Sequence, residues 1–163
     1  MASGHHHDLA TKLLAVPFGL CWIPSLGMAG ACSAGLGFLL GGLWLSPDLD
    51  TRSNATRRWG PLRVLWWPYR MGLTHRSVIS HCPLVGTAGR LAYLSALVLT
   101  GSVLLSSLGG PPPAHLIQWT QELWLNERGA VIGALVGVEA SSWLHLIQDG
   151  DPTPRLPRLR RRR

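Results

Sequence analysis

Long apolar stretches dominate the hydrophobic pattern of this chain. The four longest cover positions 9–26, 28–45, 91–108 and 130–147. Each is about 18 residues long, near the short end of the ~17–25 residues that a membrane-spanning helix needs. Their only charged residues are Lys12 and Glu139, so they lack the polar face that helices of a soluble bundle carry. The pattern predicts an all-α integral membrane bundle of about four transmembrane helices.

Small residues recur at every fourth position within or beside these stretches. The rows are Gly129, Gly133 and Gly137; Gly27, Ala31 and Gly35; and Gly37 and Gly41. Such rows let helix backbones approach closely in a bilayer, where no hydrophobic drive brings helices together. They therefore favour packed helices over isolated spans.

Basic residues distinguish the two sides of this predicted bundle. The connection 46–90 carries seven arginines against two acidic residues, and the segment 155–163 carries six arginines and no acid. Because cytoplasmic connections carry an excess of Lys and Arg, we expect both segments, and with four spans also the N-terminus, to be cytoplasmic. Residues 1–150 then form a membrane-embedded helical domain, and 151–163 form a basic, disordered cytoplasmic tail.

One part of the long connection, "RRWGPLRVLWWPYRMG", mixes arginines with aromatic residues. The aromatic residues are Trp59, Trp66, Trp67 and Tyr69. Such rings favour the headgroup region of a membrane, where arginines contact lipid phosphates. We expect a short interfacial helical segment, broken at its prolines. The net charge of +7 could also suit nucleic acid, but the arginines flank apolar segments, so we expect membrane lipids as partners and no nucleic acid.

Histidines and carboxylates gather in four short segments. They are "HHHD" at 5–8, "PDLD" at 47–50, "HRSVISH" at 75–81 and "HLIQD" at 145–149. In the four-span topology all of them fall at the cytoplasmic ends of the helices. Imidazole and carboxylate groups together suit zinc, manganese or iron. Each segment alone is most often a helix cap or a turn, and only their convergence on one face predicts a metal site.

The spacing within these segments indicates which side chains can act together. His145 and Asp149 lie four residues apart, on one face of a continuing helix. Asp48 and Asp50 lie two apart and point the same way if the segment is extended. Such a pair can bridge two cations, or one carboxylate can bind metal while the other orients a histidine.

Three further features refine the predicted site. His75 and His81 lie six residues apart, a poor spacing for one site on a helix, so we expect a helix break between them or two metals. Glu139 is an acid within a span, which usually faces the bundle interior; it is not aligned with His145 and Asp149, so we expect it to support the ligands through hydrogen bonds. Thiolates are not expected to bind the metal, since the three cysteines, Cys21, Cys32 and Cys82, form no CxxC pair.

The chain resembles a family of small membrane proteins that are labelled predicted metal-binding proteins. The resemblance rests on "MASGHHHD", "GGLWLSPDLDTRS", "RRWGPLRVLWWPYR", "THRSVISH" and "GVEASSWLHLIQD", and it runs in this order from the first residue to about Asp149. That family is similar in turn to the membrane-bound metal-dependent hydrolases, whose His/Asp pattern distantly resembles that of zinc phospholipase C and related nucleases.

The resemblance implies a set of site residues. It carries over to the metal ligands His7, Asp8, Asp48, Asp50, His75, His81, His145 and Asp149, together with Arg76. It implies a hydrolase of phosphoesters, including lipids, that uses divalent ions, and we expect one to three of them, with zinc first. In this reading Asp149 is a ligand or general base, and Arg76 holds the substrate phosphate, since arginine grips phosphate bidentately. Arg76 could equally be a surface residue that follows the positive-inside bias.

Two other functions remain open from the sequence. A non-catalytic metal could tie the helix ends together in a structural or sensor protein, or in a subunit of a larger complex, and would then have closed coordination and no accessible pocket. The histidines could instead bind a pigment macrocycle, although such ligands more often lie inside an apolar span than among interfacial carboxylates.

Overall fold

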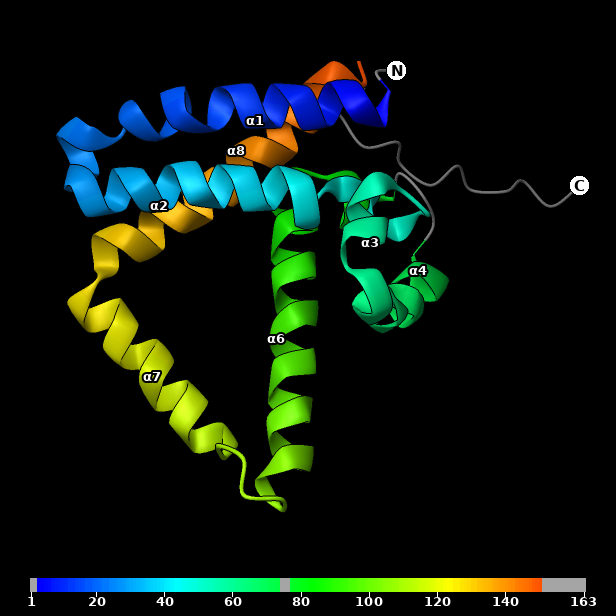
Figure 1. The fold of residues 1–163 in the computed structure, drawn as a ribbon, viewed down its shortest axis with the longest axis vertical. Coiled ribbons are helices and arrows are strands. Elements are labelled where there is room, and N and C mark those ends of the chain that lie inside the picture. Colours follow the sequence, from blue (N-terminus) through cyan, green and yellow to red (C-terminus); the bar gives the residue numbers. More distant parts are fainter. Residues whose placement is uncertain (1–2, 74–76, 151–163) are drawn as a thin grey trace, which may run out of the picture.

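The computed structural model describes residues 3–73 and 77–150, and within them every regular element is a helix. The long helices are α1 (Gly4–Leu20), α2 (Ile23–Trp44), α6 (Val85–Ser106), α7 (Pro113–Asn126) and α8 (Arg128–Gln148). A tight turn joins α1 to α2, so the two helices lie antiparallel and side by side, with α8 packed across them (Figure 1). The predicted tail, 151–163, lies outside the described residues.

The contact between α2 and α8 depends on glycine. A Cβ at Gly137 would collide with the carbonyl oxygen of Ala34, and one at Gly37 would collide with the backbone of Ala134. Both glycines are buried, and their missing side chains let the two backbones touch. The predicted packing through small residues is therefore present along this pair. Gly27 has another use: its φ of 65° places it in the left-handed region and kinks α2.

Three segments within the described residues are long and apolar enough to cross a membrane. They are Ile23–Asp50, Val85–Ser106 and Arg128–Gln148. These segments contain the predicted stretches 28–45 and 130–147 and all but the last two residues of 91–108. Most of the first predicted stretch lies in α1, which has 17 residues and is shorter than the other three.

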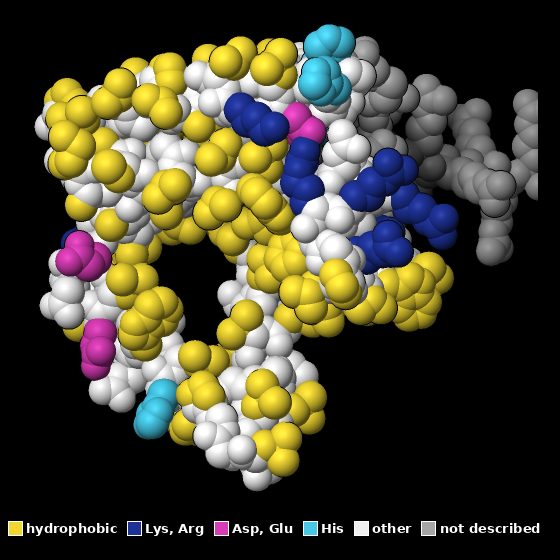
Figure 2. Space-filling view, in the orientation of Figure 1, with side chains coloured by type: hydrophobic (Ala, Val, Ile, Leu, Met, Phe, Trp, Pro, Cys, Tyr) yellow, Lys and Arg dark blue, Asp and Glu magenta, His cyan; other side chains and the backbone are white. Residues whose placement is uncertain are grey.

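Helices α6 and α7 extend away from the layer of α1, α2 and α8. Helix α6 leaves the layer at a steep angle, and α7 runs back to the start of α8 (Figure 1). Figure 2 shows an opening between these helices that hydrophobic side chains border. On α6, large apolar side chains such as Val98, Val103 and Leu104 are exposed, as expected of a helix that faces lipid.

Short helices fill the connection between α2 and α6. They are η1 (Pro47–Asp50), α3 (Asn54–Arg58), η2 (Gly60–Trp66), α4 (Trp67–Gly72) and α5 (Val78–His81). The helical character of the aromatic segment agrees with the sequence prediction. Two of its aromatic rings, those of Trp66 and Tyr69, are buried in the protein and do not lie at the expected interface.

Trp66 and Tyr69 are buried and belong to a small core with Leu49 and Ala55. The two rings meet edge to face at 5.4 Å, and both contact Tyr93 of α6. Burial raises the pKa of the Tyr69 hydroxyl. These aromatic contacts fasten the connection to α6, whereas Trp67 remains exposed.

Candidate metal centre

The segments that carry the predicted ligands meet at one end of the helical layer. The start of α1, the end of α2, helix α5 and the end of α8 all lie there (Figure 1). Local sequence signals place the side chains. Ser3 caps α1 by accepting a hydrogen bond from the His6 backbone, and Ser46 caps η1 by accepting one from the Asp48 backbone. Each polar segment therefore begins or ends a helix at the same end of the bundle.

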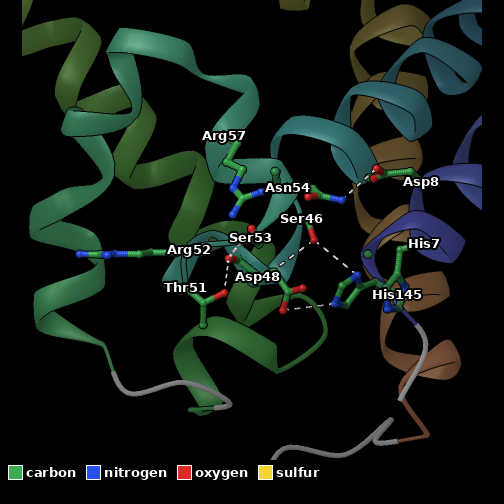
Figure 3. A pocket seen from close by; sticks show the side chains of 13 residues that line it. His7, Asp8, Ser46, Asp48, Thr51, Arg52, Ser53, Asn54, Arg57 and His145 are labelled. Carbon is green, nitrogen blue, oxygen red and sulfur yellow. Dashed lines mark hydrogen bonds and ion pairs between the residues drawn. The ribbon is translucent and has the colours of Figure 1, made fainter.

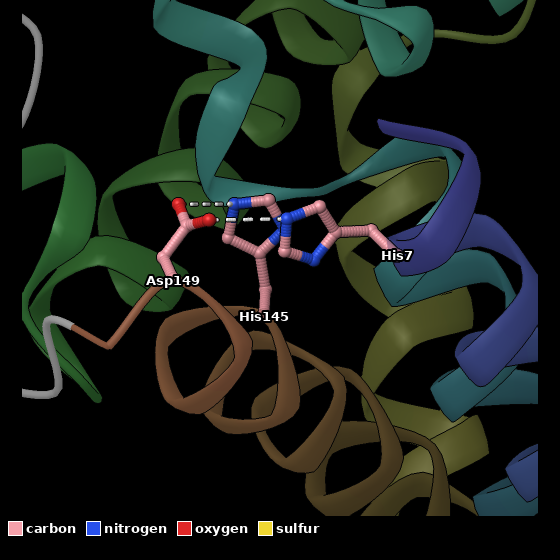
Figure 4. A group of neighbouring side chains, drawn as sticks. All are labelled: His7, His145 and Asp149. Carbon is pink, nitrogen blue, oxygen red and sulfur yellow. Dashed lines mark hydrogen bonds and ion pairs between the residues drawn. The ribbon is translucent and has the colours of Figure 1, made fainter. Parts of the chain in front are cut away.

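The first group consists of His7, His145 and Asp149. His7 Nε2 lies 3.2 Å from Asp149 Oδ1, and His145 Nε2 lies 3.7 Å from Asp149 Oδ2. The imidazole rings stack with their centroids 4.0 Å apart. Figure 4 shows both rings facing the carboxylate of Asp149. Both histidines are buried, and their ligand atoms are close enough to share one cation with Asp149.

The second group consists of Asp48, Asp50 and His81, and it too could share one cation. His81 Nε2 lies 3.8 Å from Asp48 Oδ1, and His81 Nδ1 lies 3.5 Å from Asp50 Oδ2. Asp50 and His81 are buried, while 27% of the Asp48 side chain is exposed. Asp48 is therefore the accessible edge of this group.

Asp48 also joins the two groups. Its Oδ1 atom lies 3.5 Å from His145 Nε2 as well as 3.8 Å from His81 Nε2. One carboxylate oxygen thus faces an imidazole nitrogen of each group. A carboxylate in this position can bind a cation in either group or bridge a cation in each.

His7, His81 and His145 each have a polar neighbour at Nδ1. His7 Nδ1 lies 2.8 Å from Gln148 Oε1, His81 Nδ1 lies 2.9 Å from Ser80 Oγ, and His145 Nδ1 lies 3.4 Å from Ser46 Oγ. In His7 and His145 the other nitrogen, Nε2, faces carboxylates. In His81 both nitrogens face a carboxylate, Nε2 that of Asp48 at 3.8 Å and Nδ1 that of Asp50 at 3.5 Å. Metal-binding histidines are commonly oriented in this way, with one ring nitrogen fixed by a hydrogen-bonding partner and the other directed at the metal.

The donor atoms fit a divalent cation. Around a tetrahedral metal with bonds of about 2.0–2.1 Å, neighbouring ligand atoms lie roughly 3.3 Å apart. The imidazole–carboxylate distances of 3.2–3.8 Å lie near this value, and most are too long for good hydrogen bonds. His145 Nε2 is buried and has no hydrogen-bond partner among the described residues. Buried polar atoms are rarely left in this state, so a cation explains it well.

The remaining predicted site residues fall into three cases. His75 and Arg76 lie outside the described residues. Asp8 forms an ion pair with Arg58 and accepts a hydrogen bond from Asn54 at 3.5 Å, so in this structure it belongs to neither ligand group. Glu139 accepts a hydrogen bond from the Leu84 backbone at 2.9 Å.

The contact of Glu139 has a structural consequence for the second ligand group. Leu84 has a φ of 62°, a strained value for a residue with a side chain, and it lies in the turn between His81 and α6. The Glu139 carboxylate thus holds this turn against α8. This hydrogen bond goes to the backbone of Leu84, and the role of Glu139 as a support of the ligands stays a prediction.

Arg90 is a supporting residue that the sequence reasoning assigned only to topology. Its side chain is almost completely buried and donates hydrogen bonds to Ser80 O at 2.9 Å, Thr87 Oγ1 at 3.1 Å and Ser142 Oγ at 2.7 Å. It therefore ties the residue before His81 to α8, one turn before His145. The sequence offered one signal, an arginine at the border of an apolar stretch. Ionisable residues that lie within membrane segments usually pair with one another or with backbone carbonyls.

An open pocket of about 360 Å³ adjoins Asp48 and His145. Figure 3 shows Asp48, His7 and His145 on one side of it and polar residues of the following turn on the other. Thr51 and Ser53 each donate a hydrogen bond of 3.0 Å to the Asp48 backbone oxygen, which fixes the turn. The candidate centre is therefore reachable from outside through a polar pocket.

Comparisons with known proteins place the chain in a family. A protein from Aquifex aeolicus (strain VF5), described as "Uncharacterized protein", is 46% identical over 61 residues, which are 37% of this chain and 43% of the relative. The alignment thus spans less than half of that relative. No solved structure matches the chain. Residues 2–158, nearly the whole chain, match the family described as uncharacterized metal-binding protein (DUF2227), and the protein therefore belongs to this family of metal-binding proteins.

Proposed function

We propose that this protein is an integral membrane hydrolase that cleaves a phosphoester or lipid-linked substrate at the cytoplasmic face with the help of divalent metal. The observation that carries the proposal is that His7, His81 and His145 each direct Nε2 toward a carboxylate, that of Asp149 for His7 and that of Asp48 for His81 and His145. The polar pocket beside Asp48 gives a substrate access to this point.

The two ligand groups would each hold one ion, with Asp48 between them. Zinc suits the mixture of imidazole and carboxylate best, and manganese or iron also fits. When bound, the metal would polarise a phosphoryl oxygen and lower the pKa of water. In the chain itself, Asp149 would act as ligand or general base, and His75 would add a further imidazole. Arg76 would hold the substrate phosphate.

The proposal includes four membrane spans, with both termini in the cytoplasm. Three helices have the necessary length and apolarity, and α1, which packs along α2, would be the fourth, at the short end of the ~17–25 residues required. The metal centre would then lie at the cytoplasmic surface, beside the arginine-rich connection.

A non-catalytic metal centre is the second candidate. Burial of His7, His81 and His145 favours it, because a metal held there would tie the ends of α1, α2, α5 and α8 together. It predicts closed coordination. The exposed edge of Asp48 and the adjoining pocket favour the hydrolase instead.

A paired measurement of metal content and hydrolysis tests the proposal. Wild-type protein in detergent is compared with Asp48→Asn, which removes the shared carboxylate charge, and with His115→Gln, which changes an exposed histidine of α7. We expect bound metal and phosphodiester hydrolysis in the wild type and in His115→Gln, and loss of both in Asp48→Asn. Bound metal without hydrolysis of phosphomonoesters, phosphodiesters or phospholipids would favour the non-catalytic centre. A protein that binds no metal would exclude both functions.

A further inference from the structure

A second pocket of about 680 Å³ lies in the arginine-rich connection, and four arginines line it. Arg52 follows η1, Arg57 belongs to α3, Arg63 to η2 and Arg70 to α4. Four separate elements thus bring a guanidinium group to one hollow. Among the described lining residues none is acidic.

The charge of this hollow is not balanced by the surrounding protein. Among the described residues, none of the four guanidinium groups forms an ion pair, although the neighbouring Arg58 pairs with Asp8. Like charges gathered in one cleft repel each other and create a positive potential that attracts an anion. Arg70 adds a buried Nε without a hydrogen-bond partner in the described part of the chain. The pocket therefore has the donors and the charge for an anionic group.

The surroundings of the pocket favour an amphipathic anion. Trp67 and Val64 line it and are 57% and 65% exposed. Leu62, which lies between the lining residues Pro61 and Arg63 in the sequence, is 56% exposed. Figure 2 shows basic side chains gathered over this region with hydrophobic ones directly below them. A free phosphate ion would use only the arginines. A lipid with a phosphate headgroup would also cover the exposed apolar side chains.

The pocket is also connected to the candidate metal centre. Arg52 and Arg57 line both pockets. In Figure 3 Arg57 points toward the turn that holds Asp48, whereas Arg52 extends away from His145. These two residues form the shared wall of the two pockets.

We propose that the pocket formed by Arg52, Arg57, Arg63 and Arg70 binds the phosphate of an anionic lipid headgroup. Guanidinium groups grip phosphate oxygens bidentately, and the exposed Trp67 and Val64 contact the apolar part of the lipid. That this lipid is also the substrate of the metal centre is a further step, which rests on the proposed function. Binding in the pocket requires only the arginines and is independent of the metal.

The test measures binding of dihexanoyl phosphatidic acid to the metal-free protein in detergent by isothermal titration calorimetry. Inorganic phosphate and dihexanoyl phosphatidylcholine serve as comparison ligands. The variant Arg57→Gln/Arg63→Gln removes two exposed charges of the pocket, and Lys12→Gln removes an exposed charge from α1, outside both pockets. Arg63→Gln alone serves if the double variant does not fold.

We expect phosphatidic acid to bind the wild type and Lys12→Gln equally, and at least tenfold more tightly than either comparison ligand. Binding should weaken at least tenfold in the double variant and should fall with rising salt concentration. Unchanged binding in the arginine variants would overturn the proposal. Equal affinity for inorganic phosphate would overturn the lipid as ligand and identify a simple phosphate site.

A parallel titration of Asp48→Asn separates this inference from the proposed function. Phosphatidic acid should bind this variant as it binds the wild type, whether or not the variant retains metal. A protein without metal or hydrolase activity that still binds phosphatidic acid through the arginines would refute the hydrolase and leave the lipid site standing. Loss of lipid binding in Asp48→Asn would refute the metal-independent pocket.

Discussion

Asp48 Oδ1 lies 3.5 Å from His145 Nε2, and this contact joins the end of α2 to the end of α8. The same oxygen faces His81 Nε2 at 3.8 Å. One carboxylate therefore stands between the two groups of candidate ligands. Its central position distinguishes it from Asp50, which contacts His81 alone among the described histidines.

This difference predicts unequal effects of two matched substitutions. Asp48→Asn should lose most of the bound metal, because it weakens both groups, whereas Asp50→Asn should retain the ion held by His7, His145 and Asp149. Metal content per chain, measured by elemental mass spectrometry on purified protein, checks this. Equal losses in the two variants would show that Asp48 does not serve both groups.

Removal of the metal should lower the stability of the folded protein, because the ligands come from four helical segments. A ligand at a hundredfold excess over its Kd stabilises the native state by about 2.7 kcal/mol. We expect a chelator to lower the melting temperature of the wild type and zinc to restore it. In Asp48→Asn the chelator should have much less effect. A chelator effect of the same size in both proteins would mean that the metal binds elsewhere.

Arg90 should support the second ligand group through Ser80 and Ser142. Arg90→Lys keeps the positive charge but loses the planar guanidinium group with its fixed set of donors. Arg90→Met removes the charge as well and leaves the Ser80 carbonyl oxygen without a donor, which costs about 1–3 kcal/mol of folding free energy. Loss of a residue that orients ligands typically weakens metal binding by about 10–100-fold. We expect weaker metal binding in both variants, larger in Arg90→Met, as measured by competition with a chromogenic chelator.

Arg128 provides the control for this prediction, because it is exposed and stacks on Trp124 at the other end of α8. Arg128→Met should bind metal like the wild type. If Arg90→Met also did so, Arg90 would stabilise the fold without positioning His81.

Two glycines should respond in opposite directions to the same substitution. Gly137→Ala places a methyl group against the backbone of α2, and such overpacking costs about 1–3 kcal/mol. Gly101→Ala on α6 meets open space and should gain up to about 1 kcal/mol of helix propensity. Thermal melting in detergent measures both. If Gly137→Ala left the melting temperature unchanged, α2 and α8 could move apart without loss of stability.

The natural cysteines test the membrane topology. Cys21 is exposed in the turn between α1 and α2, and Cys82 follows His81 at the metal end. In single-cysteine variants, a membrane-impermeant maleimide should label Cys82 only in inside-out vesicles and Cys21 only in right-side-out vesicles. Cys32, exposed within α2, should face lipid and react poorly in both. Labelling of Cys21 and Cys82 from the same side would exclude the proposed crossing of α1.

The sequence predicted the helices and the end of the bundle at which the ligands gather, but not every partner. Asp8 matched the ligand pattern, yet in the structure it pairs with Arg58. Trp66 and Tyr69 suited an interface by composition, yet they pack against Tyr93. Each of these partners comes from a distant segment, and local spacing carries no information about how two such segments are rotated toward each other.

Local pattern by itself determined the all-α class, three of the four predicted membrane-length helices, and the placement of His7, Asp48 and His145 near the ends of long helices. These follow from hydropathy, helix periodicity and caps, which act within one segment. Only the tertiary structure decided that Asp48 faces both His81 and His145, and that Arg90 links Ser80 to Ser142. Those contacts depend on how closely α2 and α8 approach at Gly37 and Gly137, and on the rotation of each helix, which the packing of the whole bundle sets.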